Sequence, residues 1–236
     1  MPRRVLVIPL LMVGMGTAAI FLYAHYRPSG LRAVRVFAWL RSPESKDSRV
    51  IPLGARCGDA PFIFPTTGIA GFLWDDSFRL GHRHQGVDIF AGTDVNVTPV
   101  IAVYPGFLTR LPEWKSSVIV RVPRDPLEPG RQIWVYYTHM ADAVGNAFIS
   151  DEFPPGTYEA AVEAGTFLGR QGDYSGDPNN PVGVHLHISI VKDDAGRFMN
   201  ELEIANTYDP SPYFGLALKA SLSPDDAPVC KADPPE

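Results

Sequence analysis

The sequence predicts a mostly β protein, in which antiparallel sheets form one folded domain preceded by one N-terminal transmembrane helix. Three observations predict this class. Short runs of β-branched and aromatic residues recur after residue 50, 23 prolines and 21 glycines supply turns between them, and residues 5–24 are uniformly apolar. No stretch after residue 50 repeats apolar residues at the 3.6-residue period of a long helix.

The apolar segment at residues 5–24 follows a short tail, residues 1–4, and contains no charge. At 1.5 Å per residue, a helix of this length spans roughly 30 Å, which is the hydrocarbon thickness of a bilayer. A cleaved signal peptide is the alternative and would make the protein secreted, but Leu22-Tyr23-Ala24 fits the A-x-A cleavage pattern poorly. We therefore expect an uncleaved, single-pass membrane anchor.

Arginines flank the apolar segment on both sides, so charge alone does not fix its orientation. Arg3 and Arg4 precede it and four more arginines follow between residues 27 and 41, so a literal positive-inside count would leave the rest of the chain in the cytoplasm. Long following domains translocate largely regardless of charge, and the two cysteines suggest an oxidising compartment. We expect the folded domain to lie outside the cytoplasm, in the periplasm or at the cell exterior, anchored in the cell membrane.

Residues 25–49 are expected to form a juxtamembrane stalk and linker, and residues 50–236 the folded domain. The apolar spacing of residues 31–40 fits either a short amphipathic helix at the membrane surface or a plain stalk. Residues 41–48, RSPESKDS, have the polar composition of a linker. Cys57 and Cys230 lie near the two ends of the folded domain, where they form either a disulfide or two inert thiols.

The overall charge argues against nucleic acid as a partner. The formal net charge is -5, and the body of the chain has no cluster of lysine and arginine of the kind that a phosphate backbone requires.

Four runs predict strands of the sheet. They are VNVTPVIAVYPG, SSVIVRV, RQIWVYYTH and GVHLHISIVKD, at residues 95–106, 116–122, 131–139 and 183–193. Turn sequences such as RDPLEPG and SGDPNNPVG lie between them.

The last of these runs carries two histidines one residue apart, His185 and His187. Successive side chains of a strand point to opposite faces, so both imidazoles share one face, while Leu186 and Ile188 point to the other. That arrangement suits two histidines acting on one centre.

A second motif, HRHQGVD, places His84 and Asp88 four residues apart, on one face whether the segment is extended or helical. Gly86 lies between them, and a residue without a side chain leaves room for an ion or a substrate. His82 shares a face with His84 in an extended segment, so local geometry alone does not separate the two; only the spacing to Asp88 favours His84.

Together the two motifs predict a site for one Zn²⁺ per chain. Imidazole and carboxylate are ordinary zinc ligands, and a catalytic zinc takes three protein ligands and a water whose pKa falls to about 7. His84, Asp88 and one of His185 or His187 would make such a set. The remaining histidine of the pair and His139 would move protons or stabilise an oxyanion.

These blocks resemble the lysostaphin-type (LytM-like) zinc metallopeptidases, which are peptidoglycan endopeptidases. The resemblance runs from about Phe64 to Phe214. It rests on HQGVDIFAGTDVNVTPVIAVYPG, YTHM, VEAGTFLGRQGDYSG, HLHISI and TYDPSPYF in the family's order. It implies zinc on His84, Asp88 and His187, with His139 and His185 as the catalytic histidines, and an antiparallel sheet that lines a long open groove.

The sequence departs from the family pattern in three places. Residues 141–165 are longer than the usual connection, SGDPNNPVG replaces a commoner Gly-Pro, and Ile188-Ser189 stands where Phe-Glu is usual. We expect the first two segments at the groove rim.

The resemblance implies a zinc endopeptidase that hydrolyses peptide bonds of peptidoglycan cross-links or stem peptides. The alternative is a non-catalytic peptidoglycan-binding scaffold, or an activator of another wall hydrolase, with the same fold. A regulatory protein partner is compatible with either function, and the sequence does not identify one.

Overall fold

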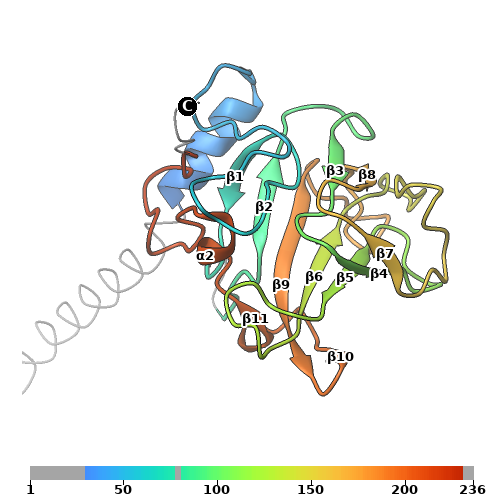
Figure 1. Cartoon of the computed structure of the whole chain (residues 1–236). Helices are drawn as coiled ribbons and strands as arrows, with labels where there is room; N and C mark the ends of the chain where they lie inside the picture. Colours follow the sequence, from blue (N-terminus) through green and yellow to red (C-terminus); the bar gives the residue numbers. More distant parts are fainter. Residues whose placement is uncertain (1–29, 78–80, 231–236) are drawn as a thin grey trace, which may run out of the picture.

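The computed structural model describes residues 30–77 and 81–230 (Figure 1). Its main element is a nine-stranded antiparallel sheet, which confirms the mostly β class. The expected anchor at residues 5–24 lies outside the described residues. Within the described part, no helix is both long enough and apolar enough to cross a membrane.

The main sheet has the order β1-β2-β9-β6-β5-β4-β7, with β10 and β11 also paired to β9. Strands β3 and β8 form a separate two-stranded sheet. The bounds are β1 (Ile69–Phe72), β2 (Val87–Phe90), β3 (Pro99–Ile101), β4 (Gly106–Thr109), β5 (Val118–Val122), β6 (Ile133–Thr138), β7 (Ala160–Val162), β8 (Phe167–Arg170), β9 (Leu186–Asp194), β10 (Arg197–Phe198) and β11 (Thr207–Tyr208). A 3-10 turn, η1 (Ile204–Asn206), and a short helix, α2 (Ser211–Phe214), follow β10.

Three of the four predicted runs contain the central strands β5, β6 and β9. The fourth differs, because residues 95–97 form a turn and only β3 and the first residue of β4 lie in strands within that run. Asn96 has φ 61°, a left-handed conformation that ends any strand through this position. Asparagine adopts it more readily than β-branched residues do.

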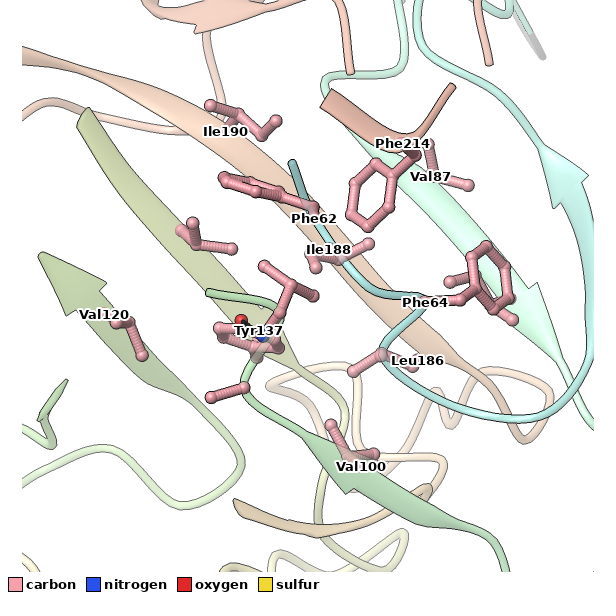
Figure 2. Packing of buried hydrophobic residues seen from close by; sticks show 14 of the residues in the cluster. Phe62, Phe64, Val87, Val100, Val120, Tyr137, Leu186, Ile188, Ile190 and Phe214 are labelled. Carbon is pink, nitrogen blue, oxygen red and sulfur yellow. Dashed lines mark hydrogen bonds between the residues drawn. The ribbon is translucent and has the colours of Figure 1, made fainter. Parts of the chain in front are cut away.

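One face of the sheet carries the main core. Leu186, Ile188 and Ile190 alternate along β9 and are at most 1% exposed, and they pack with Phe62 and Phe64 (Figure 2). The residues between them therefore point to the opposite face. Because side chains alternate strictly along a strand, burial of this set leaves His187 on the other side.

The chain before residue 50 is part of the folded domain, which differs from the expected stalk. Residues 30–40 are helical and lie beside β1 (Figure 1). Val36 and Trp39 pack with Ile69 and Phe90 in a second apolar cluster, so the boundary predicted near residue 50 is not a boundary in packing. Composition missed this because the helix buries only one narrow stripe.

Cys57 and Cys230 form a disulfide with a sequence separation of 173 residues. Of the two alternatives, the structure therefore has the cross-link. It joins the segment before β1 to the segment after α2, so all the strands lie within one covalent loop.

Removing this disulfide should lower the free energy of unfolding by about 2–5 kcal/mol, because the cross-link restricts the unfolded chain. We expect urea unfolding of the variant Cys57→Ala/Cys230→Ala to have a lower midpoint than that of the wild type. Reductant should lower the wild-type midpoint and leave the double variant unchanged. Equal midpoints for wild type and variant would show that the cross-link does not contribute.

Candidate metal centre

Three adjacent strands place polar side chains in one row across the sheet. Asp88 of β2 lies directly opposite His187 of β9, and His187 lies opposite Thr138 of β6. The neighbours Val87 and Ile89 are buried in the core on the other face. The alternation that builds the core thus also brings Asp88 and His187 together.

His84, Asp88 and His187 form a group of possible metal ligands, with one atom from each residue within 4.8 Å of the others. The atoms converge more closely than that limit. His84 Nε2 is 3.1 Å from Asp88 Oδ1 and 3.1 Å from His187 Nδ1, and His187 Nδ1 is 2.8 Å from Asp88 Oδ1. Neighbouring ligands of a tetrahedral zinc with bonds of about 2.0–2.1 Å lie roughly 3.3 Å apart, so this donor set fits the ion.

His84 reaches the centre from the segment before β2. Its backbone N–H donates to Asp76 O at 2.8 Å, and its carbonyl accepts from the Asp75 N–H at 2.8 Å. Its ring Nδ1 lies 3.0 Å from the carbonyl oxygen of Leu73. A carbonyl can only accept, so Nδ1 carries a proton, and Nε2 is the ring atom that faces Asp88 and His187 and that can bind a metal when the ring is neutral.

His139 and His185 stand beside this group, with ring centroids 4.5 Å apart. His185 immediately precedes β9, pairs with Gly172 in an isolated bridge, and has Nε2 3.6 Å from Asp88 Oδ1. His139 follows β6 and has φ 71°, a left-handed conformation that is uncommon outside glycine. Such backbone strain persists only where the surroundings impose it, and it often marks functional sites.

Both of these histidines also have a backbone carbonyl at Nδ1. His139 Nδ1 lies 2.6 Å from Tyr174 O, and His185 Nδ1 lies 2.5 Å from Gly183 O. Nδ1 is therefore the donor in each ring, and Nε2 is the acceptor of the neutral form. Three of the four histidines of the centre, His84, His139 and His185, thus have a backbone carbonyl at Nδ1.

Burial and charge set the protonation of the cluster. Burial disfavours the Asp88 carboxylate, but His84, His185 and the hydrogen bond from His187 outweigh it and hold the pKa of Asp88 well below its usual range. Burial also opposes charge on His84, yet Asp88 raises the pKa of that imidazole. Asp88 is therefore an anion at neutral pH, as a metal ligand must be.

Burial, helped by the neighbouring His185 and His187, lowers the pKa of His139 to about 3. His139 is therefore neutral at neutral pH, with an Nε2 that accepts hydrogen bonds. Burial likewise lowers the pKa of His187, although Asp88 partly offsets that effect.

Two glycines allow close backbone approaches at the centre. A Cβ on Gly86 would lie 2.2 Å from Ile188 O and 2.8 Å from His187 Nε2. The expectation that Gly86 leaves room for an ion or substrate is thus corrected: the missing side chain lets the chain approach β9 and His187. A Cβ on Gly172 would lie 2.0 Å from Ala141 O and 2.6 Å from His139 O, so this glycine brings the His185 segment against the His139 segment.

The centre opens into a cavity of about 1070 Å³ lined by residues from several loops. Residues 175–176 and 182–184, from the SGDPNNPVG segment and its continuation, line the cavity as expected. Within the described chain, the other expected rim segment, residues 141–165, contributes nothing to the lining. The two differ because residues 160–162 form strand β7, at the edge of the sheet far from β2.

Sequence reasoning missed several residues of the site. Phe90 stacks on His185 with ring centroids 5.0 Å apart, and Tyr136 lies 6.5 Å from His187 by the same measure. Position could have indicated both, because Phe90 is two residues after Asp88 on β2 and Tyr136 is two before Thr138 on β6. The carbonyl partners of the histidines have no side-chain signature in the sequence.

No family model matches the chain, and no curated protein matches it. Solved structures do. The catalytic domain of the antimicrobial peptidase lysostaphin from Staphylococcus simulans aligns with 16% identity and TM-score 0.40, over 66% of this chain and 93% of that one.

A peptidase M23 from Pseudomonas aeruginosa, described as putative, aligns with 17% identity and TM-score 0.38, over 77% of this chain and 62% of that one. A glycyl-glycine endopeptidase lytM from Ruminococcus gnavus, also described as putative, aligns with 23% identity and TM-score 0.35, over 55% of this chain and 45% of that one. The matches thus span less than two thirds of these two chains. The similar structures include lysostaphin, after which the family suggested by the motifs is named.

Paired substitutions should separate His84 from its neighbour His82, which also lines the cavity. His84→Ala should weaken Zn²⁺ affinity by more than the roughly 10–100-fold that loss of an outer-sphere partner costs. His82→Ala should leave the affinity nearly unchanged, because the metal group contains His84 and not His82. Competition with a chromophoric chelator measures both constants. A larger loss for His82→Ala would reverse the assignment.

Proposed function

We propose that this protein is a zinc-dependent endopeptidase that hydrolyses peptide bonds in peptidoglycan cross-links or stem peptides. The observation that carries the proposal is the convergence of His84, Asp88 and His187 beside two further histidines at an open cavity. Zinc held by this set would lower the pKa of a coordinated water to about 7 and polarise a substrate carbonyl.

His139 and His185 are assigned to proton handling and to stabilising the tetrahedral intermediate. Each has its Nδ1 proton engaged by a backbone carbonyl, which fixes the ring and directs chemistry to Nε2. Because burial lowers its pKa, His139 is neutral, and its Nε2 would accept a hydrogen bond from the attacking water and orient it. His185 lies nearer the carboxylate of Asp88 and the stacked ring of Phe90.

The groove supports a peptide substrate. Its lining includes aromatic side chains and groups able to form hydrogen bonds, among them Trp114, Tyr136 and Tyr174. The cavity volume of about 1070 Å³ is large enough for several residues of an extended peptide. Peptidoglycan enters the proposal through the sequence blocks that resemble wall endopeptidases.

The proposed location is the outer side of the cytoplasmic membrane, with residues 5–24 as the anchor. The disulfide supports an oxidising compartment, because such bonds persist mainly outside the cytosol. Peptidoglycan lies in that compartment, so location and substrate agree.

Zinc-loaded full-length protein in detergent should cleave defined muropeptides, and a chelator should abolish the cleavage until zinc is restored. Mass spectrometry of the products identifies the bond that is cut. Binding of the metal-loaded protein to the wall without any cleavage would contradict the enzyme and support the scaffold alternative.

His139→Ala should retain zinc and lose about 10²–10⁴-fold in cleavage rate, because it removes a proton-handling group but no ligand. Metal content by atomic emission, together with the muropeptide digest, measures both properties. Loss of zinc from this variant would show that His139 has been given the wrong role. Zinc retained with full activity would remove it from the mechanism.

A further inference from the structure

Arg32 is fully buried in the helix at residues 30–40, although an arginine is almost never buried without a specific set of partners. Its guanidinium donates to Gly71 O at 3.1 Å, to Ser223 O and to the carboxylate of Asp76. The side chains of Arg32 and Asp76 are both 0% exposed. Neither residue is a metal ligand or one of the two catalytic histidines of the proposed function.

Asp76 connects this arginine to a metal ligand through two short paths. Its second carboxylate oxygen accepts from the Leu73 N–H at 2.6 Å, and the Leu73 carbonyl holds His84 Nδ1 at 3.0 Å. Its backbone carbonyl accepts from the His84 N–H at 2.8 Å. Asp76 therefore borders both the ring and the main chain of His84.

The contact to Gly71 leads to the second ligand. Strand β1 shifts register between Ala70 and Phe72, and Phe72 is the residue paired with Asp88. Gly71 lies in this irregularity, where its carbonyl accepts from Arg32. One guanidinium thus ties the beginning and the end of the segment 71–76, which lies against both His84 and Asp88.

A buried ion pair is weak evidence for stability, because desolvation of the two charges offsets their attraction. The rigid, planar fork of arginine is instead suited to fixing several acceptors at set positions. We propose that Arg32, acting through Asp76 and Leu73, is a positioning residue that holds the metal ligand His84 in its binding orientation. The inference rests on the metal site of the proposed function.

A second set of contacts from the same helix supports this role. Val36 and Trp39 pack against Phe90, which stacks on His185 with an interplanar angle of 26°. The helix therefore contacts two segments that hold the site: residues 71–76 through Arg32, and Phe90 through Val36 and Trp39. It supports the metal site and is not only a stalk.

The test measures Zn²⁺ affinity of the full chain by chelator competition and records the absorption spectrum of the Co²⁺-substituted protein. Arg32→Met should weaken the affinity about 10–100-fold and alter the Co²⁺ bands, since loss of an outer-sphere partner has effects of that size. Arg35→Met is the matched control: it removes an arginine of the same helix whose partner is the exposed Asp226. Its affinity and spectrum should match the wild type.

Leu108→Ala controls for general destabilisation, because Leu108 is fully buried in β4, remote in the sheet order from β1 and β2. It should lower the melting temperature and leave metal affinity unchanged. If Arg32→Met melts earlier but binds zinc as tightly as the wild type, its role is structural only and the proposal is overturned.

Arg32→Lys provides the decision if Arg32→Met does not fold. Lysine keeps a charge for Asp76 but cannot present the planar fork, so an intermediate loss of affinity is expected and an unchanged affinity overturns the proposal. A wild-type chain that binds no zinc would instead refute the proposed function itself. The two failures are therefore distinguishable.

Discussion

The pairing of Asp88 with His187 across β2 and β9 is the contact on which the rest of the site depends. The two residues are direct partners in the strand register, and their side chains meet at 2.8 Å. A slip of one residue would send one of them to the core face, since the side-chain period of a strand is two. The apolar neighbours Val87 and Ile188 are each 1% exposed, and such a slip would remove them from the core. Their burial therefore fixes the register. The alternation of side chains along β2 and β9 thus determines both the core packing and the positions of the candidate ligands.

The histidines around this pair are oriented by the backbone more than by side chains. Leu73, Tyr174 and Gly183 each offer a carbonyl to an Nδ1 atom, at distances of 3.0, 2.6 and 2.5 Å. These carbonyls come from loops, so the loops must be placed as accurately as the strands. Gly172 allows one such placement by letting its segment contact the carbonyls of residues 139 and 141. The left-handed backbone of His139 is a local cost of turning the ring toward its partners.

The sequence predicted the strands whose pattern is strong and missed what depends on long-range contacts. β5, β6 and β9 carry β-branched and aromatic runs, whereas β7 has three residues, AAV, and no such signal. The group of His84, Asp88 and His187 follows from spacing and resemblance, because these residues sit in recognisable motifs. The burial of Arg32 could not be predicted from the sequence, because its partners at 71, 76 and 223 are far away in the chain. An arginine in an apolar stretch is otherwise typical of a surface helix. The sequence predicts that Gly86 belongs to the site, but for the wrong reason. Its missing side chain avoids a clash with β9, and the approach of β9 is not visible in the sequence.

The electrostatics of the centre links metal content to folding. A carboxylate and two imidazoles lie within 4.8 Å of one another in a largely buried place, where burial opposes the negative charge of Asp88. A divalent cation bound by this group would offset that charge, and its binding free energy would add to the stability of the native state. Arg32 and Asp76 form a second buried polar group, and they pair with each other without a metal. The Arg32–Asp76 ion pair can therefore hold residues 71–76 in place in the metal-free protein. The position of His84 then does not depend on the metal alone.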